Sequence, residues 1–407
     1  MATVRPFHAL QPTKERVSEV AAVPYDVVNT EEARILAEGK PFSYLHISRP
    51  EIDLAPGTDL YSDEVYKKGL ENFHLIQAQA PLIQEQHPTL YIYRLRMGEH
   101  TQIGVVGCCA VDEYDNDIVR KHERTRKDKE DDRTRHTITL RAQTGPVFLT
   151  YRGQDQINTL VNAVVATEPH FDFVAPDGVA HTVWKIASSD EFVKAFESVP
   201  LLYVADGHHR SASASRARAA LKAENPNHNG TEEYNYFLSV MFPADQLRIL
   251  PYNRVVKDLN GHNETEFFTL LEKEFTVSAN AAATPLNKGE FSMYINKQWY
   301  SLKPKQAIDS TNVISSLDVS LLQDRLLSPI LGIEDPRTDK RIDFVGGIRG
   351  TKELEQLVDN GKAAVAFSLY PTTLDDLMNI ADAGEIMPPK STWFEPKLRS
   401  GMLVHLI

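Results

Sequence analysis

Short stretches rich in apolar and β-branched residues alternate along this chain with stretches of helical spacing. From Thr89, the sequence TLYIYRLRMGEHTQIGVVGCCAVDEY places two β-rich segments on either side of a glycine-containing turn, which predicts a hairpin in a central sheet. PVFLTYRG and LLYVADG predict further strands, the second bounded by Pro200 and an Asp-Gly turn. Residues 29–39 begin with an Asn-Thr cap and end at Gly39, so we expect a short helix there.

The same alternation continues in the second half of the chain. The pattern predicts a hairpin around FSMYINKQWYSL, strands at AVAFSLY and GMLVHLI, and helices over 264–275, 317–331, 352–359 and 373–383. There is no fixed-period repeat and no low-complexity tract. We therefore expect a mixed α/β fold with two regions, residues 1–260 and 261–407. The late segment MPPKSTWFEPKL has the composition of a binding site and could return to the first region.

Composition narrows the class of protein. With 407 residues, 42% hydrophobic and 25% charged, the chain is globular and long enough for two or three cores. No run approaches the roughly 20 apolar residues that span a bilayer, and residues 1–14 lack the apolar stretch of a signal peptide. We expect a soluble, cytoplasmic protein without a membrane partner. The two cysteines, Cys108 and Cys109, are adjacent in an apolar run and are predicted to be core residues of a strand.

Charge and missing motifs exclude several functions. A net charge of −12 disfavours a nucleic-acid partner, because neutralisation of phosphates supplies most non-specific affinity for nucleic acids. Local basic clusters then indicate a small anion as ligand. The chain has no GxxxxGK[ST] loop, HExxH helix, G-x-S-x-G turn or protein-kinase signature, which disfavours P-loop and protein-kinase chemistry. The sequence does not indicate an oligomeric state.

The sharpest motif joins a predicted strand to a predicted helix: Asp206, Gly207, His208, His209 and Arg210. Unpaired N–H groups and the helix dipole make the first turn of a helix a site for phosphate oxygens. The glycine permits a tight turn, the next three side chains add hydrogen-bond donors, and the aspartate could coordinate a metal or orient a histidine. A capped helix with surface histidines is the plain alternative, but two histidines and an arginine at one helix start favour function.

A second cluster covers residues 120–136, RKHERTRKDKEDDRTRH. It contains eight basic and five acidic residues, two histidines and two threonines, and nothing apolar. Such a stretch is not expected to bury a core face. Its plain interpretation is an exposed helix with ion pairs at three- and four-residue spacing, for example Glu130 with Arg133.

The functional interpretation makes the same cluster a lid or arm over a phosphorylated substrate. Lys129 and Arg133 would neutralise phosphates, while Glu123, Glu130 or Asp132 would bind a divalent cation or accept a proton. Magnesium with phosphoryl substrates commonly needs only one or two protein carboxylates.

Smaller candidates lie on proline-containing loops, where ordered polar side chains often serve ligands. Each could also be an ordinary turn or a packed terminal loop. They come from the segments RPF, VPYD, LPYNR and PPKSTWFEPK, and the candidate residues are Arg5, Asp26, Asn253, Arg254, Lys390, Ser391 and Thr392.

Taken in order, RPF, VPYDVV, KHExTxxxKExDR, ADGHHR, LPYNR and MPPKSTWFEPK resemble the DUF1015 family, a bacterial and archaeal domain of unknown function. The resemblance covers nearly the whole chain. DGHHR is similar to the phosphate-binding box of the ParB and sulfiredoxin superfamily, where a related turn starts a helix at the ligand. This implies a ParB/sulfiredoxin-like core with a mixed sheet and an additional α/β C-terminal region.

Resemblance also implies an activity. Similar family members include a pyrophosphate-dependent kinase of free L-serine, and the superfamily contains an ADP-dependent serine kinase. The implied reaction is phosphoryl transfer from pyrophosphate to L-serine with Mg²⁺, giving O-phospho-L-serine for cysteine synthesis. On this basis the phosphate-binding residues are Lys129, Arg133, Gly207, His208, His209 and Arg210. The catalytic candidates are Asp26, Glu123, Glu130, Asp206 and His209, with Asp206 and Glu130 as metal ligands.

Three alternatives differ in chemistry. A sulfiredoxin-like activity needs a nucleophilic thiol where this chain carries His208. A non-catalytic ParB-like nucleotide or nucleic-acid binding protein needs a basic DNA-binding segment, which the net charge disfavours. A kinase that uses another small hydroxyl acceptor or a nucleotide donor has the same site requirements, so the sequence leaves that alternative open.

Overall fold

The computed structural model describes residues 1–80, 82–309 and 311–407, and these form two compact units. The first unit comprises Met1–Leu247 together with Pro396–Ile407, and the second comprises Arg248–Glu395. The division therefore falls before the expected boundary at 260/261. The reason is that β14 (Tyr252–Val256) pairs with strands of the second unit, β18 (Ile342–Gly346) and β19 (Val365–Leu369).

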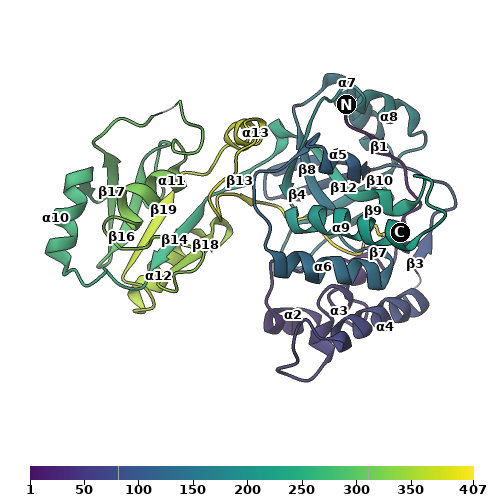
Figure 1. The fold of residues 1–407 in the computed structure, drawn as a ribbon, viewed down its shortest axis with the longest axis horizontal. Helices are drawn as coiled ribbons and strands as arrows, with labels where there is room; N and C mark the ends of the chain where they lie inside the picture. Colours follow the sequence, from purple (N-terminus) through teal and green to yellow (C-terminus); the bar gives the residue numbers. More distant parts are fainter. Residues whose placement is uncertain (81, 310) are drawn as a thin grey trace. The chain divides into compact units, whose positions relative to one another are not determined.

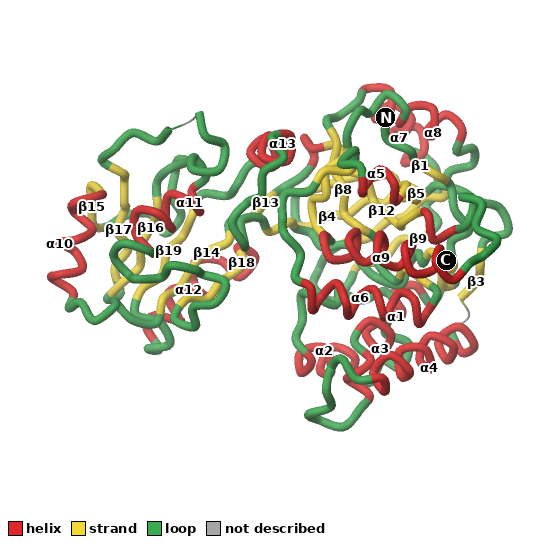
Figure 2. Tube along the Cα trace, viewed as in Figure 1, coloured by secondary structure: helices red, strands yellow, loops and turns green. Residues whose placement is uncertain are grey.

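A mixed sheet forms the centre of the first unit (Figures 1 and 2). Within the described residues it has nine strands, in the order β6-β11-β8-β12-β5-β4-β10-β9, with β1 beside β5. Two neighbouring pairs are parallel, β11 with β6 and β12 with β8, and the other pairs are antiparallel. The strands are β1 (Val4–Arg5), β4 (Tyr91–Met97), β5 (His100–Ala110), β6 (Val119–Arg120), β8 (Val147–Tyr151), β9 (Phe171–Val174), β10 (Ala180–Lys185), β11 (Leu202–Asp206) and β12 (Tyr236–Pro243). This confirms the mixed α/β class.

The hairpin expected from Thr89 onward is β4 and β5, whose register runs from Tyr91 opposite Val106 to Met97 opposite His100. Both cysteines lie on β5, fully buried and unbridged, as the apolar run predicts.

Helices stack away from this sheet in successive layers. α9 (His208–Glu224) packs on α6 (Lys127–Leu140), and α6 packs on α4 (Asp63–Gln79), beside α2 (Thr30–Ala37) and α3 (Leu45–Ser48) (Figure 1). The remaining helices of this unit are α1 (Val17–Val20), α5 (Val111–Asp115), α7 (Asp155–Val165) and α8 (Asp190–Phe196). No helix in the described ranges is both long and apolar enough to cross a membrane.

The structure corrects the expectation that residues 120–136 form an exposed helix or arm, because one face of α6 is buried. Asp132, His136 and Leu140 are buried. The hydroxyl of Tyr66 donates to Oδ1 of Asp132 at 2.9 Å, and Nε2 of His136 lies 2.9 Å from the carbonyl oxygen of Ile47. A stretch without apolar residues thus buries one face, because α4 and α3 supply polar partners.

Two hydrophobic cores hold the first unit together. One lies between the sheet and its flanking helices and includes Leu149, Val204 and Phe237. The other joins α2–α4 to the end of α6 and includes Tyr44, Phe73 and Leu140. The active-site candidates in α6 and α9 therefore sit on helices fixed by packing.

The last residues of the chain, 396–407, lie among elements of the first unit. The N–H of Leu10 donates to the carbonyl oxygen of Val404, and the N–H of Ser400 donates to that of Ala22, each at 2.9 Å. The expected final strand is short: β21 (His405–Leu406) pairs with β7 (Ala142–Gln143).

The second unit has its own antiparallel sheet, with six strands among the described residues in the order β15-β17-β16-β19-β14-β18. The expected hairpin FSMYINKQWYSL forms β16 (Phe291–Ile295) and β17 (Gln298–Pro304), and β15 (Phe275–Ala279) lies at one edge. Its helices are α10 (Glu264–Glu274), α11 (Asp318–Leu322), α12 (Gly350–Asp359) and α13 (Leu374–Asp382). The helix expected over 317–331 is shorter, because α11 ends at Leu322 and a π-helix follows at Gln323–Leu327.

Candidate functional site

The strand-to-helix turn between β11 and α9 has the backbone that the DGHHR motif predicts. Gly207 adopts φ 96°, a left-handed conformation that glycine enters at little cost. Its N–H donates to Oδ1 of Asp206 at 2.8 Å, and its carbonyl oxygen accepts from Arg210 and Ser211. The N–H groups of His208 and His209 precede these bonds and have no partner within the helix. A helix start of this kind binds anions.

Arg210 is fixed by several neighbours. Its Nη1 donates to the carbonyl oxygen of Pro146 at 2.8 Å, and its Nη2 lies 3.9 Å from Oδ1 of Asp26. The guanidinium also stands over the ring of Tyr25, 5.5 Å from its centroid. A hydrogen bond, an opposite charge and an aromatic face together hold the cation in one orientation.

These residues border one small pocket. It is lined by Asp26, Asp206, Gly207 and Arg210, and closed by Pro24, Pro146, Phe148 and Leu398. Four of the residues expected from separate motifs, VPYD and DGHHR, therefore meet at the same place. Two carboxylates, one guanidinium and a helix start surround a space bounded otherwise by apolar side chains.

Lys397 is a cationic residue of the site that is not among the residues predicted from the sequence. Its Nζ lies 2.7 Å from Oδ2 of Asp206. Burial alone would raise the pKa of Asp206, but Lys397 outweighs it, Arg210 and His208 add to the effect, and the pKa falls to about 2. The carboxylate is therefore ionised at neutral pH. The sequence signal for Lys397 is the segment PPKSTWFEPK, in which the predicted substrate-binding lysine is Lys390.

Arg133 is a second arginine that contacts the ring of Tyr25. Its guanidinium lies 4.2 Å from the centroid of the Tyr25 ring, and its Nε donates to Oδ2 of Asp132 at 2.9 Å. Both arginines line a cavity of about 30 Å³, together with Tyr25, His136, Ser213 and Ser400. A polar cavity of this size has room for ordered water. Lys129, by contrast, donates to the hydroxyl of Tyr61 at 3.1 Å.

Glu130 has partners that the helical spacing did not predict. It accepts a hydrogen bond from the hydroxyl of Thr125, and Nη1 of Arg216 on α9 lies 3.2 Å from Oε2. The expected pair with Arg133 is wrong, because Arg133 bonds to its neighbour Asp132. Packing of α6 on α9 thus replaces an ion pair within one helix by an ion pair between two helices.

His209 is a neutral hydrogen-bond donor. Burial lowers its pKa below the ordinary histidine value, against the opposing effects of Glu123, Asp26 and Glu130. Its Nε2 accepts the N–H of Arg126 at 3.1 Å. In a neutral ring whose Nε2 accepts, the proton resides on Nδ1. His209 therefore offers an N–H at Nδ1.

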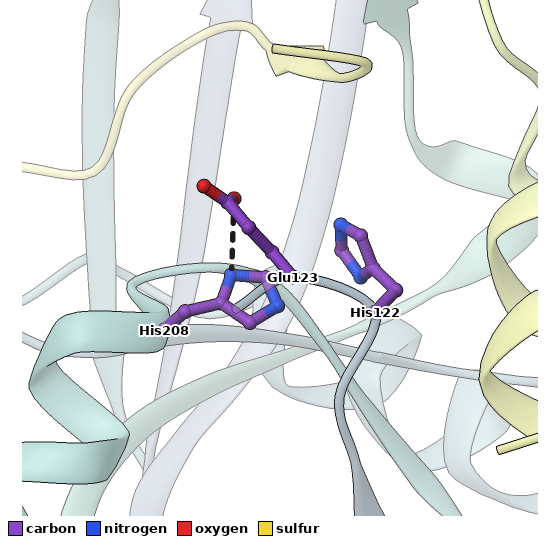
Figure 3. Close-up of side chains that lie close together, drawn as sticks. All are labelled: His122, Glu123 and His208. Carbon is purple, nitrogen blue, oxygen red and sulfur yellow. Dashed lines mark ion pairs between the residues drawn. The ribbon is translucent and has the colours of Figure 1, made fainter. Parts of the chain in front are cut away.

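The side chain of His208 faces Glu123 and His122 (Figure 3). Its Nδ1 lies 3.7 Å from Oε2 of Glu123, and its ring stands at 89° to that of His122, with centroids 4.5 Å apart. Burial lowers the pKa of His208 to about 4 and that of His122 well below its ordinary value, although Asp206 and the backbone of Val204 oppose the second shift. Both imidazoles are therefore neutral. His122 is not among the residues predicted from the sequence, although it belongs to the KHE of the second motif.

One family of proteins matches most of this chain. A family model described as protein of unknown function (DUF1015) matches residues 4–320. The chain belongs to the DUF1015 family. This confirms the family resemblance, and five of the six motifs lie within the matched residues, whereas MPPKSTWFEPK at 387–397 lies outside them. No curated protein matches the chain.

Solved structures give only distant likenesses to this DUF1015 protein. A free serine kinase in complex with AMP is 13% identical, with 72% of this chain and 86% of that chain covered and a TM-score of 0.35. A conserved hypothetical protein from Pyrococcus furiosus is 14% identical, with 74% and 95% covered and a TM-score of 0.35. SbnI with a C-terminal truncation, from Staphylococcus aureus, is 11% identical, with 74% and 87% covered and a TM-score of 0.40. At such TM-scores these likenesses carry no argument about function.

The remaining candidates have structural partners of their own. Arg5 pairs with Glu233 at 2.9 Å and lies over the ring of Tyr236. Its role in substrate binding stays a prediction.

Five candidates belong to the second unit of this DUF1015 protein. Oδ1 of Asn253 accepts the N–H of Leu369, and Nη2 of Arg254 donates to the carbonyl oxygen of Lys390 at 3.0 Å. Burial lowers the pKa of Arg254 to about 9. Ser391 donates to the carbonyl oxygen of a proline three residues earlier. The assignment of these residues, and of Thr392, to the substrate stays a prediction.

Proposed function

We propose that this protein is a small-molecule kinase that transfers a phosphoryl group from inorganic pyrophosphate to the hydroxyl of free L-serine, giving O-phospho-L-serine and phosphate. One observation carries the proposal: the start of α9, the Arg210 guanidinium and the carboxylates of Asp26 and Asp206 border a single pocket. Phosphoryl transfer needs positioning and neutralisation of charge more than covalent help from the protein. These groups supply both.

Pyrophosphate suits this site because it is compact and densely charged. The N–H groups of His208 and His209, the Nδ1–H of His209 and the Arg210 fork would bind its oxygens. Gly207 lets the backbone approach closely, since it carries no Cβ at this point. The motifs that resemble those of the pyrophosphate-dependent serine kinases support this donor over a nucleotide.

Magnesium would enter with the phosphates. Asp206 would hold it, because this ion is commonly bound by one or two carboxylates together with substrate phosphates and water. When bound, the ion neutralises charge on the phosphoryl group. Glu130 stays a candidate ligand, although Arg216 already compensates its charge.

The two pocket carboxylates would have different roles. Asp206, with a pKa of about 2, is a weak proton acceptor and suits a cation. The side chain of Asp26 is 40% exposed and lies 3.9 Å from Arg210, so it is open to an incoming hydroxyl. We assign to Asp26 the proton of the serine hydroxyl. A loose transition state needs only a positioned acceptor of this kind.

Mass spectrometry of reactions with single acceptors tests the substrate assignment. The protein would be given pyrophosphate and Mg²⁺ with L-serine, D-serine, L-threonine or glycerol. We expect a phosphorylated product from L-serine, and a loss of product in Asp26→Asn while the matched variant Asp245→Asn retains it. A product from glycerol or threonine but not L-serine would replace the acceptor and keep the kinase. Absence of product with every acceptor would reject the kinase itself.

A further inference from the structure

Two buried imidazoles and a carboxylate converge beside the first turn of α9 (Figure 3). His122 and Glu123 follow β6, and His208 is the first residue of α9. One potential ligand atom from each of the three side chains lies within 4.8 Å of the other two. The phosphate site described above uses the backbone N–H of His208, not its ring, so this cluster is a separate feature of the same turn.

The imidazole rings of His122 and His208 are unusual because they are buried without the hydrogen bonds that buried polar groups normally make. His122 is 2% exposed and His208 is 4% exposed. Neither nitrogen of His122, nor Nε2 of His208, makes a hydrogen bond of normal geometry. A buried polar group without a partner costs about 1–3 kcal/mol, so several such groups at one point call for an explanation. A bound ion would give these nitrogens a partner.

The chemical type of the potential ligand atoms indicates which class of metal ion would bind to this cluster. Neutral imidazole nitrogens suit zinc, copper, iron and nickel, whereas magnesium prefers oxygen ligands. Two histidines with one glutamate also form known catalytic zinc sites that keep a position open. Metal–nitrogen bonds of about 2.0–2.1 Å place tetrahedral ligand atoms roughly 3.4 Å apart, so the widest separation in the cluster would have to shorten by up to about 1.4 Å. The side chain of Glu123 is 42% exposed, so it borders solvent on one side.

We propose that His122, Glu123 and His208 bind one divalent transition-metal ion through two imidazole nitrogens and one carboxylate oxygen. This site is distinct from the one proposed for Mg²⁺ at Asp206. The inference does not depend on the proposed kinase activity, because it rests on these three side chains alone. An ion held there also adds positive charge beside the anion-binding start of α9.

Metal binding by the full-length protein tests the proposal. The protein would be stripped with a chelator and then titrated with Co²⁺, whose visible spectrum reports its ligands, and with Zn²⁺, Mn²⁺ and Mg²⁺ in equilibrium dialysis. We expect one equivalent of Co²⁺ to bind and to be displaced by Zn²⁺ but not by a large excess of Mg²⁺. Glu123→Gln should weaken Co²⁺ binding at least about tenfold, and His208→Asn or His122→Asn should weaken it further.

A neighbouring histidine supplies the control. His209→Ala removes an imidazole from the same turn but outside the cluster, so it should change Co²⁺ affinity less than about twofold. Because buried histidine variants can unfold, the decisive variant is the half-exposed Glu123→Gln, with its fold checked by circular dichroism. Native Co²⁺ affinity in Glu123→Gln, displacement by Mg²⁺, or no binding by the native protein would overturn the proposal. None of these outcomes bears on phosphoserine formation, which is measured separately.

Discussion

The guanidinium of Arg210 lies against the backbone of Gly145. A Cβ atom at Gly145 would stand 3.0 Å from Nη1 of Arg210 and 2.8 Å from Oγ of Ser400. The adjacent carbonyl, that of Pro146, accepts the hydrogen bond from the same Nη1. The missing side chain at position 145 thus gives Arg210 the space from which it reaches the pocket at the start of α9.

Gly145→Ala should displace Arg210 and weaken pyrophosphate binding. The new methyl group takes space that the guanidinium occupies, so we expect the Kd for pyrophosphate to rise about tenfold, the cost of a misplaced charge-assisted hydrogen bond. Isothermal titration calorimetry measures this. Gly153→Ala is the control, because its new Cβ would meet the movable carboxylate of Asp245 at 3.1 Å. Equal affinity in both variants would show that Arg210 does not bind the anion.

Arg210→Ala should lower kcat by about 100-fold or more, the usual effect of removing a group that stabilises charge in the transition state. Arg218→Ala on the same helix is the matched control. Its guanidinium is equally buried but pairs with Asp112 and Asp115. Steady-state turnover and thermal denaturation would be measured for both. If the two variants lose turnover to the same extent, the effect comes from damage to α9 and not from the pocket.

Gly207→Ala separates backbone strain from function. At φ 96° any residue with a Cβ is strained, while the nearest atom to the new Cβ would be 3.5 Å away. The expected loss is therefore conformational, about 1–2 kcal/mol of unfolding free energy. Gly178→Ala, at φ 82° with no neighbour within 4 Å, should lose a similar amount. Chemical denaturation and activity assays should show similar stability losses but lower turnover only for Gly207→Ala. Native turnover in Gly207→Ala would remove this turn from the site.

Asp318 should make the stability of the second unit depend on pH. Burial raises its pKa to about 7, the N–H of Gly289 and the charge of Lys288 oppose the shift, and Asp376 adds to it. Because the folded form holds its proton more tightly, this contribution is complete below the unfolded pKa near 4 and is lost as pH rises to about 7.

Replacing that carboxyl by an amide removes the pH dependence. Asp318→Asn keeps an oxygen for the N–H of Gly289, which now donates to both carboxyl oxygens. The unfolding free energy of Asp318→Asn, taken relative to that of the native protein, should be higher at pH 8 than at pH 5 by on the order of 2 kcal/mol. Urea unfolding at both pH values measures the difference. An advantage that does not change with pH would mean that Asp318 is ionised in the folded protein.

The sequence was most informative where local chemistry decides the structure. The DGHHR turn follows from a strand that ends at an Asp-Gly pair, and the N–H of Gly207 indeed bonds to Asp206. The helix expected from residue 29 begins with the side chain of Asn29 accepting from Glu32, a capping box readable from the sequence. Both features depend on residues a few positions apart.

What the sequence could not predict depends on residues that are far apart in the chain. Lys397 and Asp206 are separated by 191 positions, and no periodicity relates them. His122 meets His208 only because β6 pairs with β11, the strand before α9. The polar face of α6 becomes buried because distant groups, such as the hydroxyl of Tyr66, satisfy it. Tertiary contacts of this kind override the local pattern.

Phosphorus NMR of the purified protein with Mg²⁺ and L-serine identifies the donor and the product together, with pyrophosphate, ADP or ATP supplied singly. We expect the pyrophosphate signal to be replaced by phosphate and O-phosphoserine in equal amounts, ADP and ATP to give no phosphoserine, and Arg210→Ala to slow the conversion. Phosphoserine formed only from a nucleotide would contradict the donor, and no phosphoserine from any donor would contradict the serine-kinase account.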